Sequence, residues 1–284
     1  MALAALLAAA VAALTPQQKA ALVVVSGLPA PHGVGGVLVQ RWSRDYDRNT
    51  EAIVFADQEG GDVRALRELP PARPASVYRS AADARAAGRA TGLALRGAGV
   101  DVDLAPVLDA PDGPLGSRHF RRAAFGLAFA RGLRDGGVQG CVKHFPGLGS
   151  ARVSTDEAPH VDARVRGWEV AAFASAIRAG VGCVMTSNGF YDGAPFRATI
   201  SRDTYRRLRA LGFGGVAITD SLSIVRRAPV ERWARAAALA GADLVLFTSP
   251  AHARRAIVAL TPLARSGALD GHVARVLAFR ARLR

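Results

Sequence analysis

Lys143 and His144 stand side by side at the end of the apolar run VQGCVKHF (138–145), and a Pro-Gly pair follows at 146–147. An ammonium and an imidazole can both donate hydrogen bonds, so together they can orient a ligand that carries several hydroxyl groups. Of the 37 Lys and Arg side chains, only Lys19 and Lys143 are lysine. A lysine kept among so many arginines marks this pair as the first candidate for a functional site, because a guanidinium cannot replace a compact ammonium at a tight site.

Other polar side chains occupy the point where further apolar runs end. These are Asp57, Asp109, Asn188 and Asp220. In a parallel barrel the carboxyl ends of the strands meet on one face and form the active site, so we expect these side chains to converge with Lys143 and His144. An alternative stays open for Asp220, which could instead cap the segment that begins at Ser221.

The apolar runs have the lengths of buried strands and alternate with segments of helical period. Strands are expected at 21–27, 35–40, 52–58, 100–109, 138–145, 181–188, 215–221 and 242–249. Helices are expected at 81–98, 120–135, 166–179, 202–211 and 229–240. Strands separated mostly by helices predict the α/β class and a single-domain (β/α)8 TIM barrel. An open, doubly wound sheet is the alternative, but no glycine-rich phosphate-binding turn follows the first strand.

The size and hydropathy of the chain agree with one large globular domain. It has 284 residues, 50% of them hydrophobic, and a mean hydropathy of +0.15. Met1–Leu14 is apolar and Ala-rich, and it is interpreted either as a packed N-terminal helix or as the remnant of an export or anchoring segment. We therefore expect the barrel to span 15–284 without an integral membrane span, and the compartment, cytoplasmic or exported, stays open.

The charge and the cysteines say little about partners or cofactors. The formal net charge is +14, but the arginines are spread along the chain without a block of cations, so nucleic-acid binding is not expected. No His, Cys and Asp cluster has ligand spacing, so the sequence predicts no metal and no cofactor. Cys141 and Cys183 are most simply two small buried thiols, although a bridge is possible if their strands are neighbours.

Several segments appear in the same order as in a known family. They are DQEGGDVRAL (57–66), DLAPVLD (103–109), GSRHF (116–120), KHFPGLG (143–149), VMTSN (184–188), GFGGVAITDSLSI (212–224) and AGADLVLF (240–247). Together they resemble the single-domain β-N-acetylglucosaminidases, or β-N-acetylhexosaminidases, of glycoside hydrolase family 3, over residues 15–284. The resemblance implies a retaining, exo-acting, cofactor-free glycosidase for cell-wall or related β-linked amino-sugar glycans, as in peptidoglycan turnover, and a monomer is expected.

The same resemblance implies roles for the matching positions. Asp220 would be the nucleophile that attacks the anomeric carbon and forms a glycosyl-enzyme intermediate. Asp57 would accept a hydrogen bond from a sugar hydroxyl, while Arg118, Lys143 and His144 would donate to hydroxyls.

Two nearby acids have supporting roles. Glu59 follows Asp57 by two positions, but the glycines after it suggest a turn, so it is expected to hold the loop. Asp109 is expected to brace neighbouring strand ends by bonding backbone N–H groups or Lys143. Asn188, at the end of VMTSN, is a secondary candidate for the site.

The loop after the Lys-His pair departs from the family pattern. The family continues KHFPGHG and, after four variable residues, Asp-Ser-His, whose His is the acid/base. Here Leu148 replaces the first His, and Ser-Thr-Asp stands at 154–156. Three interpretations stay open: Asp156 is the acid, Glu157 or His160 takes the role, or no acid is placed. In the third case the protein is a catalytically weak or inactive barrel that binds a glycan or a partner.

Overall fold

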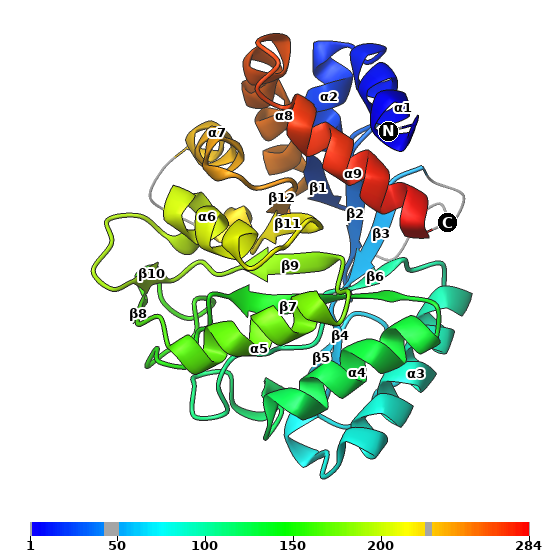
Figure 1. Ribbon diagram of the computed structural model, residues 1–284, viewed down its shortest axis with the longest axis vertical. Coiled ribbons are helices and arrows are strands. Elements are labelled where there is room, and N and C mark those ends of the chain that lie inside the picture. Colours follow the sequence, from blue (N-terminus) through cyan, green and yellow to red (C-terminus); the bar gives the residue numbers. More distant parts are fainter. Residues whose placement is uncertain (1, 43–50, 225–228, 284) are drawn as a thin grey trace.

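The computed structural model describes residues 2–42, 51–224 and 229–283 of the chain (Figure 1). Its main sheet has eight strands, all paired in parallel. They are β1 (Val24–Gly27), β2 (Gly36–Val39), β3 (Ile53–Ala56), β6 (Val102–Asp103), β7 (Gln139–Phe145), β9 (Cys183–Thr186), β11 (Val216–Thr219) and β12 (Val245–Phe247). The strands neighbour one another in chain order, β12 pairs with β1, and a bridge between Ile218 and Leu244 joins β11 to β12. The sheet therefore closes, and the predicted (β/α)8 barrel is confirmed.

Helices surround the barrel (Figure 1). They are α1 (Ala2–Ala12), α2 (Pro16–Leu22), α3 (Ala81–Gly97), α4 (Ala123–Asp135), α5 (Gly167–Arg178), α6 (Arg202–Ala210), α7 (Val230–Ala240), α8 (Pro250–Arg265) and α9 (Asp270–Leu283). The five helices predicted from periodicity are present, with ends shifted by up to three residues. Helix starts follow local chemistry: the Ser80 hydroxyl accepts from the Asp83 N–H at the start of α3, and Thr15 and Gln18 form a capping box on α2.

The core has an inner and an outer layer. Val25, Leu38, Phe55, Ile218 and Leu246 belong to the buried cluster inside the barrel. The outer cluster joins the other faces of the strands to the helices, which is why these strands read as continuous apolar runs. Val11 of α1 is buried in the outer cluster, whereas the division of the chain near residue 14 remains a prediction. Within the described residues, no helix combines the length and the hydropathy that a membrane crossing needs.

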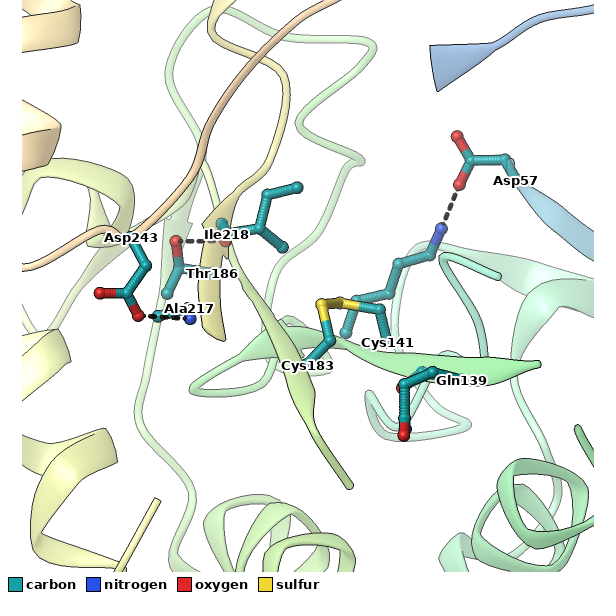
Figure 2. Close-up of a disulfide and its surroundings, with 10 residues drawn as sticks. Asp57, Gln139, Cys141, Cys183, Thr186, Ala217, Ile218 and Asp243 are labelled. Carbon is teal, nitrogen blue, oxygen red and sulfur yellow. Dashed lines mark hydrogen bonds and ion pairs between the residues drawn. A yellow bond between two sulfur atoms is a disulfide. The ribbon is translucent and has the colours of Figure 1, made fainter. Parts of the chain in front are cut away.

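Cys141 and Cys183 form a disulfide between β7 and β9 (Figure 2). They are register partners on these strands, their Cα atoms lie 4.5 Å apart, and both side chains are fully buried in the inner cluster. The interpretation as two free thiols is therefore wrong. Sequence alone could not decide the pairing, because it depends on which strands become neighbours and in which register.

Short elements at the carboxyl ends of the strands shape the loops. Two small sheets pair β4 (Gln58–Gly60) with β5 (Val63–Arg64), and β8 (Asp162–Ala163) with β10 (Phe190–Tyr191). Single turns of 3-10 helix cover Ala75–Val77, Gly116–Arg118, Ala198–Ile200 and Leu222–Ile224. Because β4 follows β3 almost directly, it carries Glu59 over the end of the barrel.

Candidate active site

Lys143 is a buried cation held by two carboxylates. Its Nζ lies 2.6 Å from Asp57 Oδ1 and 2.6 Å from Glu59 Oε1, and the pair with Asp57 is drawn in Figure 2. The Lys143 side chain is only 3% exposed, whereas that of Asp57 is 38% exposed. Burial would lower the pKa of Lys143, but the charges of Asp57 and Glu59 outweigh it and raise the pKa above the ordinary lysine value. The ammonium is therefore permanently charged and fixed in place.

Glu59 joins this lysine to an arginine. The guanidinium of Arg118 binds Glu59 with two hydrogen bonds, from Nε and Nη2, each 2.8 Å long. Burial would raise the pKa of Glu59, but the charges of Lys143 and Arg118 and their hydrogen bonds lower it to about 2. Glu59 therefore does more than hold its own loop, the role expected from sequence: it orders two cations of the site.

Asp156 reaches the same network from the divergent loop. Its Oδ2 lies 3.8 Å from Nη1 of Arg118, and its side chain is 63% exposed. The hydroxyl of Ser154 accepts a hydrogen bond from the Asp156 N–H at 3.2 Å, which turns the loop at this point. A carboxylate thus lies at the rim of the site, beside a guanidinium.

His144 and Asp109 form a second buried pair. Nδ1 of His144 lies 2.7 Å from Asp109 Oδ2, while Asp109 Oδ1 accepts from the backbone N–H groups of His144 and Leu148 at 3.1 and 2.8 Å. Burial would raise the pKa of Asp109, but the charge and hydrogen bonds of His144 lower it. Asp109 thus bonds backbone groups and His144 rather than Lys143. The bond to Nδ1 leaves Nε2 as the ring nitrogen free to meet a ligand.

An irregularity in β7 explains how neighbouring residues both serve this end of the barrel. Successive side chains on a regular strand point to opposite faces. The pairing of β7 with β9 shifts register between Val142 and Phe145, so Lys143 and His144 lie in the irregular stretch.

Asp220 follows β11 and lies in the field of the groups just described. Its Oδ1 accepts a hydrogen bond from the Ser221 N–H at 2.7 Å. Burial raises the pKa of Asp220, the charge of Asp156 raises it further, and the charges of His144 and Lys143 lower it. Thr219 is the register partner of Thr186, and Thr186 is that of Phe145, so Asp220 lies at the same end of the barrel as the Lys-His pair.

The remaining candidates lie in different surroundings. His160 pairs with Asp162 at 3.1 Å, stacks on Phe190 with ring centroids 4.1 Å apart, and is half exposed. Glu157 is exposed on the divergent loop. Asn188 is buried and donates from Nδ2 to the Ser221 carbonyl at 3.0 Å, so it fixes the backbone next to Asp220.

The position of the first missing motif histidine has become part of the core. Leu148 is 1% exposed and belongs to a buried apolar cluster with Val107, Tyr191 and Ala198. No ionisable group is available from that position. Asp156 is therefore the sequence candidate for an acid that the structure places beside the Lys143, Glu59 and Arg118 network.

Comparison with known proteins decides the family. The model described as the glycosyl hydrolase family 3 N terminal domain matches residues 38–279. The chain belongs to glycosyl hydrolase family 3. It is 33% identical to a β-hexosaminidase of Alkalilimnicola ehrlichii over 243 residues, which cover 76% of this chain and 70% of that protein.

Two further comparisons place this family 3 chain among its relatives. An uncharacterized secreted glycosyl hydrolase of Arthroderma benhamiae is 35% identical over 197 residues, 60% of this chain and 55% of that protein. The structure of a family 3 β-N-acetylglucosaminidase from Paenibacillus sp. matches with a TM-score of 0.85 at 28% identity, covering 95% of this chain and 63% of that one. The family 3 chain thus spans little more than half of the fungal relative. The resemblance seen in the sequence motifs is confirmed.

Proposed function

We propose that this family 3 barrel is a retaining, exo-acting β-N-acetylglucosaminidase that removes amino sugars from β-linked glycans of the cell-wall type. One observation carries the proposal: Asp220 directly follows β11, whose last residue is in register with Thr186 of β9 and, through it, with Phe145 next to the Lys-His pair. A carboxylate among fixed hydrogen-bond donors is the arrangement that a double-displacement glycosidase needs. The names of the relatives as β-hexosaminidase and β-N-acetylglucosaminidase agree with this sugar class.

In the first step, an oxygen of Asp220 forms a bond to the anomeric carbon while the bond to the leaving oxygen breaks. Oδ1 is occupied by the Ser221 N–H, so Oδ2 is the oxygen available for attack. Water then attacks the same carbon and gives its proton to the Asp156 carboxylate left by the first step, while the bond to Asp220 breaks, the sugar is released and the Asp220 carboxylate is restored. The positive charge that develops on the sugar ring is stabilised by nearby carboxylates, which strengthens binding of the transition state over that of the substrate.

The other residues of the site orient the sugar. One oxygen of Asp57 is taken by Lys143, and the partly exposed side chain leaves the second oxygen to accept from a hydroxyl. The ammonium of Lys143 donates to a hydroxyl, and His144, whose Nδ1 donates to Asp109, presents Nε2 to the sugar as an acceptor. Arg118 fixes Glu59, the second carboxylate that binds Lys143.

The acid is the weak point of the site. We propose that Asp156 protonates the leaving oxygen, and that it does so inefficiently in comparison with a buried acid. Its side chain is 63% exposed and lies 3.8 Å from Nη1 of Arg118, whereas an efficient acid is enclosed against the leaving oxygen. The same observation favours the second candidate function, a glycan-binding barrel with little turnover. Substrates with good leaving groups separate the two, because they depart without a proton.

The decisive experiment compares wild type with Asp220→Ala on an aryl N-acetylglucosaminide with a good leaving group. We expect hydrolysis by wild type and a loss of at least about 10³-fold in the variant, because the nucleophile is absent. Asp203→Ala is the matched control, since the Asp203 side chain is 87% exposed and pairs with Arg206 of its own helix α6. Equal product release by wild type and Asp220→Ala would overturn the assignment. Sugar binding without release by wild type would favour the second candidate.

A further inference from the structure

Asp103 is a buried carboxyl next to the charged network that the mechanism above does not use. It ends β6 and is 0% exposed. Its Oδ1 accepts a hydrogen bond from the Gln58 N–H at 3.0 Å. Its Oδ2 is buried and has no hydrogen-bond partner within the part of the chain that the structure describes. Oδ1 of Asp103 thus holds the Gln58 backbone, whereas Oδ2 makes no hydrogen bond within the described residues.

The bond to Gln58 falls at a sensitive point of the site. Gln58 lies between Asp57 and Glu59, the two acids that hold Lys143. The side chain of Gln58 is fixed as well: its amide donates to the carbonyls of Leu66, Leu69 and Pro70, and its Oε1 accepts from the Leu66 N–H. With the side chain anchored to the loop and the N–H anchored to Asp103, the backbone between the two acids has little freedom.

The surroundings of Asp103 favour its neutral form. A buried anionic oxygen without a partner is costly, and Asp57 and Glu59 add two further negative charges nearby. The charge of Lys143 opposes this, but two other carboxylates already bind that ammonium. Burial raises the pKa of Asp103 to about 8, and the charges of Asp57 and Glu59 act in the same direction. The hydrogen bond from the Gln58 N–H and the charge of Lys143 act against this rise.

We propose that Asp103 is a positioning residue that works as an uncharged carboxyl: it holds the Gln58 backbone and thereby sets where Asp57 and Glu59 meet Lys143. Ionisation of Asp103 would place another anion behind these two acids and compete for the same ammonium. The geometry of the sugar-binding acids then depends on a proton that no substrate touches. The part of this inference that concerns activity rests on the proposed glycosidase function, whereas the part that concerns protonation does not.

The test uses Asp103→Asn, which keeps the acceptor for the Gln58 N–H and cannot ionise, and Asp103→Ala, which removes the acceptor. Asp101→Asn is the matched control, because the Asp101 carboxylate also accepts a backbone N–H, that of Val54 at 2.8 Å, but precedes β6. Thermal unfolding is measured from about pH 4 to about pH 9. A folded form that keeps its proton up to about pH 8 loses stability as the pH rises from about 4 to about 8, since the unfolded carboxyl is ionised there.

We expect Asp103→Asn to flatten this decline and Asp101→Asn to retain the wild-type slope. An unchanged slope in Asp103→Asn would overturn the proposal, even if neither protein hydrolyses anything. In the activity arm, below pH 7, Asp103→Asn should keep kcat/KM within about two-fold of wild type, while Asp103→Ala should lose about ten-fold, mainly through KM. Wild type should also lose kcat/KM as the pH rises through about 8, and Asp103→Asn should not. If Asp103→Asn were as impaired as Asp103→Ala below pH 7, the charge would be needed and the inference would be wrong.

Discussion

The Asp156 carboxylate lies 3.8 Å from the guanidinium of Arg118, which in turn binds Glu59 through two hydrogen bonds. The divergent loop is therefore electrostatically connected to the buried cation at the centre of the site. This connection keeps Asp156 close to the groups that are proposed to bind the sugar, while its side chain stays 63% exposed. Under the proposed mechanism, leaving groups that need a proton should therefore depart more slowly than activated leaving groups that do not.

Asp156→Asn is expected to affect substrates according to their leaving group. On a natural disaccharide, kcat/KM should fall by about 10²-fold, because a general acid contributes this much or more to the departure of a poor leaving group. On an activated aryl glycoside the first step should proceed, and azide should raise the rate by intercepting the glycosyl-enzyme without base assistance. Both rates are measured on one preparation. A uniform loss on the two substrates, without azide rescue, would remove Asp156 from the acid role.

Restoring the family pattern should raise activity on poor leaving groups. The double variant Ser154→Asp with Asp156→His places a carboxylate two positions before an imidazole, and the intrinsic pKa of histidine suits proton transfer near neutral pH. We expect kcat/KM on a disaccharide to rise by about ten-fold or more, with little change on the aryl glycoside. Asp156→His alone is the control for the orienting carboxylate. No gain with either variant would show that the loop geometry, and not the residue type, limits proton transfer.

Glu59→Gln should destabilise the fold as well as the site. The substitution leaves two cations, Lys143 and Arg118, without the buried carboxylate between them, and breaking such a pair costs about 3 kcal/mol. The free energy of unfolding is measured by urea denaturation at neutral pH. Glu68→Gln, in the loop that follows, serves as the matched control. Stability equal to wild type would contradict the role of Glu59 as the link between the two cations.

The same carboxylate predicts a signature at acid pH. The pKa of Glu59 is lowered in the folded protein to about 2, from 4.5 in the reference state, so its contribution to stability is present above about pH 4.5 and is lost as the pH falls toward about 2. Wild type should therefore lose stability over this window more steeply than Glu59→Gln. Thermal unfolding midpoints at several pH values check this. Parallel curves for the two proteins would contradict the prediction.

Removing the bond between Cys141 and Cys183 should weaken the barrel without abolishing the site. The bond closes a loop with a sequence separation of 42, and the loss of such a cross-link typically costs about 2–4 kcal/mol. The variant with both cysteines changed to Ala is compared with wild type by urea denaturation. Wild type with reductant is the second comparison, and it should approach the variant once the thiols are accessible. An unchanged midpoint in the double variant would show that the cross-link adds no stability.

The fold was largely predictable from the sequence, because its signals are local. Apolar runs such as 215–221 and 138–145 have strand length, and the segments between them have helical period. The strand-end rule also placed Asp57, Lys143 and Asp220 at one end of the barrel, where the structure has them. Helices α8 and α9, which follow β12, were not among the helices predicted from the sequence.

The partners inside the site were less predictable, since they depend on loop geometry. Glu59 precedes two glycines that suggested a plain turn, yet β4 carries it to Lys143 and Arg118. A signal did exist: acids two positions apart share a face of a strand. Asp103 gave no comparable signal, because its burial and its single bond to Gln58 follow from the packing of the loop above β6.

Lys143 is already fixed by Asp57 and Glu59 before any ligand arrives. Ligand binding therefore does not need to order this ammonium, so no conformational entropy of the Lys143 side chain is lost at that step. The fixed ammonium also cannot shift to accommodate a ligand of different shape. A pyranose whose hydroxyl points the other way at a single carbon would meet an unmatched charge where its epimer finds a donor. If the barrel binds sugars as proposed, stereochemical discrimination is set before binding by two carboxylates that need not touch the reacting atoms.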